Sequence, residues 1–290
     1  MAISRLGRRQ QVIQQRHGLW RNRNLRGFAS GKSFRFLLLC LVLIAILPPI
    51  FFHFKLRHFH QMAAYHTALH SRVDCIEIDV SRSSDGILFA LHDRDLQQIS
   101  GNSTSKVGHL SVKEIKELDH DQNIPTVEDA LKLISSSVRQ IILDAKVGPP
   151  SYEKGLAKDI LSVVERTQCK NCLVWTKSDN LARDVMKLSP DVMVGYIVMK
   201  DPSTGARNNL LRMRGASVVG VFHPLIDEKL MKILHGRNKK VYAWTVDDQA
   251  SMKKMLYENV DAVVTSNPTL LQHLMQDIRT QCLEEGFSLS

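Results

Sequence analysis

The sequence lacks several features by which proteins are commonly assigned to a class. Its five cysteines in 290 residues are too few for a scaffold built on disulfides. Cys169 and Cys172 form an isolated Cys-x-x-Cys pair, for which a local disulfide, a weak zinc site and chance spacing all remain open. No glycine-rich dinucleotide motif and no P-loop follows a predicted strand, which argues against a nucleotide-binding open sheet.

Acidic residues are absent from the first 35 residues, which carry nine arginines and lysines. The formal net charge of the chain is +10, so these nine charges leave the remainder close to neutral. A basic groove for nucleic acid is therefore not expected, because such a groove needs positive charge clustered on the folded part. We predict no nucleic-acid partner, and no protein partner is evident from the sequence.

The basic tail at residues 1–35 is followed by a long run without charge. Phe36 to Phe52 reads FLLLCLVLIAILPPIFF, which predicts a transmembrane helix over residues 36–54. A cleavable signal peptide would have a shorter basic part and a small-residue cleavage site. The arginines should remain cytosolic, which puts the C-terminal domain of this single-pass membrane protein on the lumenal or extracellular side. Import into a plastid or mitochondrion is the alternative, because the start is acid-free and rich in arginine.

Short apolar segments alternate with amphipathic helical ones over residues 61–275, which we take as one domain before a C-terminal tail at 276–290. This alternation is typical of a parallel sheet covered by helices, and its repetition predicts an α/β fold of the TIM (β/α)8 barrel type. The predicted strands are Cys75–Val80, Leu88–His92, Gln140–Lys146, Leu173–Thr176, Val192–Val198, Ser217–Phe222, Val241–Val246 and Ala262–Thr265.

Polar residues follow several of these strands at their C-terminal ends, where TIM barrels carry their chemistry. Glu77 and Asp79 alternate with apolar residues, so both carboxylates point to the same face of their strand. Two adjacent carboxylates repel each other unless a cation lies between them. With Asp144 they offer three hard oxygen ligands, which suit Mg²⁺ or Ca²⁺. Further polar residues at strand ends are Thr245, Asp247, Thr265 and Ser266.

Three other residues complete the candidate site. His92 is the natural proton carrier, because the pKa of a histidine lies near neutrality, and the adjacent Asp93 would either orient it or cap a turn. Lys146 follows Asp144 by two residues on the same face, where it can bind a phosphate or the carboxylates. Trp244 could form a wall of the substrate pocket, although a strand tryptophan more often lies in the core.

Six motifs lie within residues 63–271: ExDV at Glu77–Val80, DGxLxxxHDxxL at Asp85–Leu96, IPTVEDAL at Ile124–Leu131, acidic-x-Lys at Asp144–Lys146, WTV at Trp244–Val246 and NVDAVVTSNP at Asn259–Pro268. Together they resemble the glycerophosphodiester phosphodiesterase family, most closely its plant members. The resemblance implies a TIM-barrel hydrolase of glycerol and phospholipid metabolism. It would cleave glycerophosphodiesters such as glycerophosphocholine to sn-glycerol 3-phosphate and an alcohol.

The same resemblance implies roles for the candidate residues. Glu77, Asp79 and Asp144 would ligate the metal, His92 would carry out acid–base catalysis and Lys146 would contact the substrate. Asp144 stands where many members of the family carry glutamate.

One departure from the family is serious. The family opens its barrel with a strand that ends in His-Arg-Gly or His-Gly-Gly and supplies a second catalytic histidine, but neither triplet occurs here. Apart from the strand before the His-Asp dipeptide, which would form a hairpin beside the barrel, seven strands are predicted where eight are needed. A missing block between Phe59 and Met62 would explain both observations. His53, His58 and His60 have no strand or glycine turn behind them and are not expected to substitute.

Two interpretations therefore remain. The chain is either a membrane-anchored, metal-dependent phosphodiesterase, or a catalytically impaired isoform or non-catalytic protein that still binds phosphodiesters.

Overall fold

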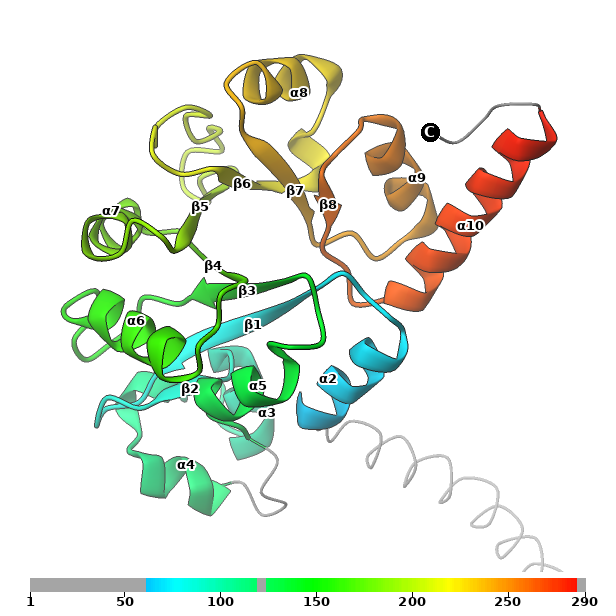
Figure 1. Cartoon of the computed structure of the whole chain (residues 1–290). Coiled ribbons are helices and arrows are strands. Elements are labelled where there is room, and N and C mark those ends of the chain that lie inside the picture. Colours follow the sequence, from blue (N-terminus) through cyan, green and yellow to red (C-terminus); the bar gives the residue numbers. More distant parts are fainter. Residues whose placement is uncertain (1–60, 119–123, 286–290) are drawn as a thin grey trace, which may run out of the picture. The chain divides into compact units, whose positions relative to one another are not determined.

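The computed structural model describes residues 61–118 and 124–285, in which strands and helices alternate (Figure 1). The elements, in chain order, are α2 (Gln61–His70), β1 (Cys75–Arg82), β2 (Leu88–Ala90), α3 (Asp93–Ser100), η1 (Val107–His109), α4 (Val112–Leu118), α5 (Val127–Ile134), β3 (Gln140–Ala145), α6 (Leu156–Arg166), β4 (Cys172–Thr176), α7 (Asp179–Leu188), β5 (Met193–Val198), β6 (Val218–Phe222), η2 (His223–Leu225), α8 (Glu228–His235), β7 (Lys240–Trp244), α9 (Gln249–Tyr257), β8 (Ala262–Val263) and α10 (Pro268–Glu284).

The strands form one sheet in the order β2-β1-β3-β4-β5-β6-β7-β8. β1 and β3 to β8 pair with their neighbours in parallel. β2 runs antiparallel to the end of β1, with Val80 opposite Ala90. Figure 1 shows the sheet curving, with helices along its outer side. The predicted TIM-barrel type of fold is confirmed, and β2 forms the expected hairpin.

Within the described residues this sheet does not close on itself. Its order ends at β2 and at β8, and no pairing joins β8 to β1. The parallel strands are β1 and β3 to β8, one fewer than a (β/α)8 barrel contains. The last helix reaches this seam, because the side chain of Gln272 in α10 donates a hydrogen bond to the carbonyl of Ser71, in the turn before β1.

β1 shows how two acidic residues fit into an apolar strand. Ile76, Ile78 and Val80 are buried in the large core between the sheet and its helices. Burial of each such side chain stabilises the fold by roughly 1.5–3 kcal/mol. The alternating Glu77 and Asp79 are only partly buried and lie on the other face. The strand period thus directs both carboxylates to the barrel interior, as predicted.

Amphipathic helices with well-formed N-termini cover the outer face of the sheet. In α5, for example, Thr126 Oγ1 accepts the N–H of Asp129, and the Asp129 carboxylate accepts the N–H of Thr126. This capping box satisfies two donors that the first turn would otherwise leave unpaired. The same helix buries Leu131 and Ile134 completely.

A second apolar cluster fills the barrel interior around Trp175 of β4, which is 2% exposed. Its side chain lies against Gly195 of β5 and Gly220 of β6, and a Cβ atom at Gly220 would lie 2.7 Å from the indole ring. Tyr242 of β7 meets this indole edge-on, with ring centroids 6.4 Å apart. The two glycines therefore provide the space that the tryptophan occupies.

Several predictions concern residues that the structure does not describe. The basic tail at 1–35 and the transmembrane helix at 36–54 lie outside the described residues. Among the helices of the described part, none is long and apolar enough to cross a membrane. At the other end, α10 runs unbroken from Pro268 to Glu284 across the boundary predicted at residue 275.

The isolated cysteine pair forms a disulfide. The Cys169–Cys172 bond joins the turn after α6 to the start of β4, with Cα atoms 5.6 Å apart. Of the three alternatives for this pair, the structure shows the local disulfide.

Candidate active site

Three carboxylates converge at the C-terminal end of two neighbouring strands. Glu77 and Asp79 come from β1 and Asp144 from β3, where Asp79 and Asp144 are direct partners in the sheet register. One carboxylate oxygen of each lies within 4.8 Å of one from each of the others. The three acids predicted as metal ligands therefore form one cluster.

Lys146 lies against this cluster. Its ammonium contacts Asp79 Oδ1 at 2.6 Å and also donates a hydrogen bond to Asp144. Burial disfavours the charged form of this lysine, but the carboxylates of Asp144 and Asp79 outweigh it and hold the pKa of Lys146 above its usual value. Lys146 thus occupies the predicted position on the same face as Asp144.

One lysine does not balance the negative charge of three acids. Burial, followed by the charges of Asp144 and Asp79, raises the pKa of Glu77 to about 8. Burial also raises the pKa of Asp144, against the opposing charge of Lys146. A partly buried site made of three hard oxygen donors and one lysine fits a divalent cation such as Mg²⁺ or Ca²⁺.

His92 follows β2 and is the N-cap residue of α3, rather than the end of a strand as predicted. Its Nδ1 accepts the backbone N–H of Arg94 at 3.1 Å. Burial holds the pKa of His92 below its usual value, and the charge of Lys146 acts in the same direction, whereas that of Asp79 acts against it. The neutral ring therefore carries its proton on Nε2.

Asp93 does not orient His92. Its Oδ1 accepts the N–H of Val107 at 2.9 Å and so attaches the start of α3 to the η1 turn.

Trp244, predicted as a pocket wall or a core residue, packs with the inner cluster at the end of β7. The centroid of its ring lies 5.4 Å from the ring centroid of Phe222 on β6. Its indole nitrogen is buried and has no hydrogen-bond partner among the described residues.

The polar residues after β7 and β8 bind one another rather than the acid cluster. Asp247 Oδ1 accepts the N–H of Ser266 at 2.7 Å and the hydroxyl of Thr265 at 3.1 Å. They hold two neighbouring loops together at this end of the barrel.

Two arginines that the sequence did not single out fix other loops at the same end. Arg82, the last residue of β1, binds the segment between β3 and α6. Its guanidinium donates to Ser151 Oγ at 2.8 Å, to the carbonyls of Tyr152 and Lys154 at 2.9 Å each, and to Asp159 of α6 at 2.7 Å.

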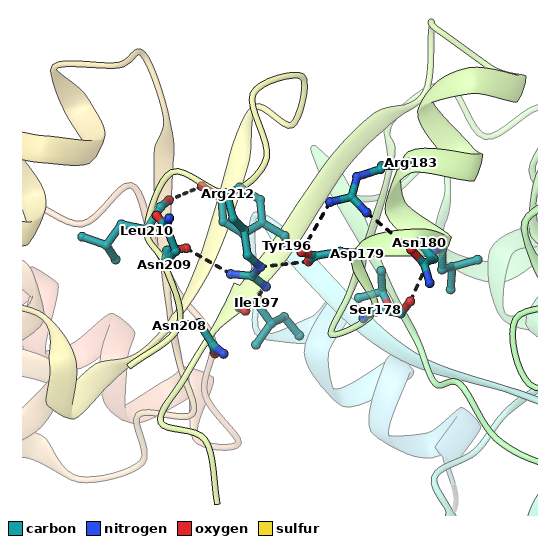
Figure 2. A network of polar contacts seen from close by, with 12 residues as sticks. Ser178, Asp179, Asn180, Arg183, Tyr196, Ile197, Asn208, Asn209, Leu210 and Arg212 are labelled. Carbon is teal, nitrogen blue, oxygen red and sulfur yellow. Dashed lines mark hydrogen bonds and ion pairs between the residues drawn. The ribbon is translucent and has the colours of Figure 1, made fainter. Parts of the chain in front are cut away.

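The second arginine, Arg212, lies between β5 and β6 (Figure 2). It donates from Nε to Asp179 Oδ1 at 2.8 Å and from Nη2 to the carbonyl of Ile197 at 2.7 Å. Its guanidinium lies over the ring of Tyr196, 4.8 Å from the centroid. The start of α7 is thereby fixed to the end of β5. Several acceptors of both arginines are backbone carbonyls, which leave no signal in the sequence.

Comparison with known proteins agrees with this geometry. The model of the glycerophosphoryl diester phosphodiesterase family matches residues 56–270. The glycerophosphodiester phosphodiesterase GDPD4 of Arabidopsis thaliana is 58% identical over 293 aligned positions, which cover 88% of this chain and 89% of that protein. A glycerophosphodiester phosphodiesterase of Caldanaerobacter subterraneus is 25% identical over 231 positions, covering 74% of this chain and 91% of that protein.

Solved structures show the same fold. A glycerophosphodiester phosphodiesterase of Parabacteroides distasonis superposes with a TM-score of 0.63 at 17% identity, covering 74% of this chain and 89% of that one. A phosphodiesterase of Oleispira antarctica, solved with the product sn-glycerol-3-phosphate, gives a TM-score of 0.59 at 22% identity, covering 73% and 88%. With the family match and the Arabidopsis relative, these findings identify the chain as an enzyme of the glycerophosphoryl diester phosphodiesterase family.

Proposed function

We propose that this chain hydrolyses glycerophosphodiesters, glycerophosphocholine among them, to sn-glycerol 3-phosphate and an alcohol, with Mg²⁺ or Ca²⁺ as cofactor. The observation that carries the proposal is the convergence of Glu77, Asp79 and Asp144 beside Lys146. The name of the Arabidopsis relative and the product bound in the Oleispira structure support the substrate class.

Glu77, Asp79 and Asp144 would hold the metal ion. When bound, such an ion supplies a Lewis acid that polarises a phosphoryl oxygen and offsets negative charge that develops at phosphorus. Burial first, and then the charges of Asp144 and Asp79, raise the pKa of Glu77 to about 8, and a bound cation would favour the ionised form against both.

His92 would carry the proton to the leaving oxygen of the alcohol. In the resting ring Nδ1 accepts the N–H of Arg94 and Nε2 carries the proton. To act as the acid, the ring would take up a second proton on Nδ1, give up that hydrogen bond and transfer the Nε2 proton to the leaving oxygen, which leaves a neutral ring protonated on Nδ1. Lys146 would contact the phosphoryl group. Trp244 would line the pocket with its ring, which packs against the inner cluster at the end of β7.

A catalytically impaired protein is the second candidate, and a specific observation favours it. The alignment with Arabidopsis GDPD4 has 293 positions but includes 88% of the 290 residues of this chain, about 255, so about 38 positions have no residue here. The missing His-Arg-Gly or His-Gly-Gly triplet and the seam between β8 and β1 support a lost block near Phe59 and Met62. With one histidine, catalysis would be slower by about 10²–10⁴-fold.

We also propose that residues 36–54 anchor the chain in a membrane and that the domain at 61–275 lies on the lumenal or extracellular side. The uncharged run after a basic tail supports the anchor. The Cys169–Cys172 disulfide supports the location, because disulfides persist in oxidising compartments.

The test is release of glycerol 3-phosphate from glycerophosphocholine by the full chain in detergent. We expect EDTA to abolish release, Mg²⁺ or Ca²⁺ to restore it, and Glu77→Ala and Asp144→Ala to eliminate it. Unchanged activity in both Glu77→Ala and His92→Ala would refute the assigned site. Binding of sn-glycerol 3-phosphate without hydrolysis would favour the impaired protein. Sequencing of the transcript that encodes residues 55–65 tests directly for a lost block.

A further inference from the structure

Lys177, which follows β4, lies at the mouth of the barrel beside the acid cluster. In the register of β3 and β4, Asp144 pairs with Trp175 and Ala145 with Thr176, so the next position places Lys177 beside Lys146. Trp175 belongs to the inner cluster, and alternate residues share a face, so Lys177 is directed to the same side. The charge of Lys177 also acts on Asp144, where it lowers the pKa of that carboxyl.

The backbone around Lys177 is fixed on both sides. Before it, Thr176 Oγ1 donates to the carbonyl of Ala145 at 3.0 Å and accepts the N–H of Ser178 at 3.1 Å. After it, the hydroxyl of Ser178 donates to Glu153.

The next residue, Asp179, is held by Arg212 (Figure 2). Lys177 itself is exposed and makes no hydrogen bond or ion pair with any other described residue. The backbone of Lys177 is therefore fixed at the site, and its ammonium is left without a hydrogen-bonded or ion-pair partner among the described residues.

Lys146, the other lysine at the site, does not provide a positive charge that is free of ion pairs. Its ammonium is bound to both Asp79 and Asp144, and its side chain is 24% exposed. The formal charges of three carboxylates, one paired lysine and a bound divalent cation sum to zero, so a phosphodiester anion that approaches them meets no net positive charge. An uncompensated cation beside them would favour its binding.

We propose that Lys177 is a second substrate-binding residue, whose ammonium donates to a non-bridging phosphoryl oxygen of the glycerophosphodiester. The inference rests on the proposed function and adds a specific contact to it. Because this contact forms in the ground state and persists in the transition state, its loss acts mainly on KM.

The test compares three variants of the full chain. Lys177→Gln should raise the KM for glycerophosphocholine and lower kcat/KM by about 10- to 100-fold, the range for a lost charged hydrogen bond, with little change in kcat or Tm. Lys177→Arg, which keeps the positive charge, should retain most of the wild-type kcat/KM. Lys170→Gln is the matched control, because Lys170 is also exposed but precedes the opposite end of the same strand, and it should behave as wild type.

Affinity for sn-glycerol 3-phosphate, measured by calorimetry with Mg²⁺ present, gives a second readout that needs no turnover. It should fall in Lys177→Gln and not in Lys170→Gln. If wild type hydrolyses glycerophosphocholine and Lys177→Gln equals it in KM and affinity, the inference is wrong and the proposed function stands. If wild type binds the product without hydrolysis, the proposed hydrolysis is wrong, and equal affinity in Lys177→Gln would refute the inference as well. If wild type neither hydrolyses glycerophosphocholine nor binds the product, both are wrong.

Discussion

At the scale of single residues, the candidate site is defined by charge that the protein alone does not balance. Three carboxylates share one lysine, and burial together with the charges of Asp144 and Asp79 raises the pKa of Glu77 to about 8. This shift gives the free energy of unfolding a dependence on pH that a single substitution can remove.

The metal-free protein should lose stability as the pH rises from about 4.5 to 8. Glu77 binds its proton more tightly in the folded state, with a pKa of about 8 against an ordinary 4.5, so its contribution is complete below 4.5 and disappears toward 8. Thermal unfolding in EDTA across this range should show a falling Tm for wild type and a flatter profile for Glu77→Gln.

Mg²⁺ added at the upper end of the range should raise the Tm of wild type, because a ligand that binds the folded state stabilises it. Equal pH slopes for wild type and Glu77→Gln would contradict the assignment of the shift to Glu77.

His92 has two roles that substitutions can separate. Asparagine retains an N-cap acceptor for α3 but carries no titrating proton, whereas alanine removes both functions. We expect His92→Asn and His92→Ala each to lower kcat by about 10²–10⁴-fold. Only His92→Ala should also lose about 1 kcal/mol of stability in denaturant unfolding. Wild-type kcat in His92→Asn would exclude His92 as the proton carrier.

The acid cluster was predictable because strand periodicity alone sets the common face of Glu77 and Asp79. The role of Asp93 was not, because its partner is a backbone N–H at Val107 in a later turn. Arg82 was also missed, because its partner Asp159 lies 77 residues further along the chain and nothing in the sequence pairs the two.

At the scale of elements, the sequence predicted the strands more successfully than the helices that bury few residues. The predicted strands all appear in the sheet, since each is a short apolar run. The helices expected from the sequence, such as Ser111–Leu118 and Thr126–Ile134, do not include α3, in which Leu96 is the single buried residue. α10 likewise buries only Leu274 and gives little periodic signal.

The packing of Trp175 predicts that Gly220→Ala destabilises the barrel by about 1–3 kcal/mol, as overpacked cores do. The added methyl group would lie 2.7 Å from the indole, whereas at Gly148 a Cβ would have no atom within 4 Å. Gly148→Ala is therefore the control, and denaturant unfolding is the measurement. Similar midpoints for the two variants would show that the inner cluster adapts.

The disulfide predicts a specific peptide map. Digestion without reductant, after alkylation in denaturant, should yield Cys169 linked to Cys172 and alkylated Cys75 and Cys282. Alkylation of all four of these cysteines in protein isolated from its native source without reductant would contradict both the disulfide and the proposed oxidising compartment.

At the scale of the whole molecule, the sequence predicted both the barrel type of fold and a missing strand. Alternating segments predicted the barrel, and the described residues contain seven parallel strands with an open seam between β8 and β1. The location of the domain relative to a membrane was not accessible, because the transmembrane helix predicted at 36–54 lies outside the described residues.

A lumenal domain should be glycosylated at Asn102, an exposed residue in the acceptor triplet Asn102-Ser103-Thr104. In microsomes, wild type and Ser103→Ala should show a gel-mobility shift that N-glycosidase removes. Asn102→Gln and Thr104→Ala should not show it. A wild-type chain without the shift would favour a plastid or mitochondrial location.

The strand order also determines which losses of sequence this architecture tolerates. Every strand from β3 to β7 is hydrogen-bonded to a neighbour on either side, so deleting one would split the ladder into two pieces. A deletion at the junction of β8 and β1 leaves one continuous ladder. Splicing at that junction would therefore add or remove a histidine-bearing strand while the register of all the others is preserved.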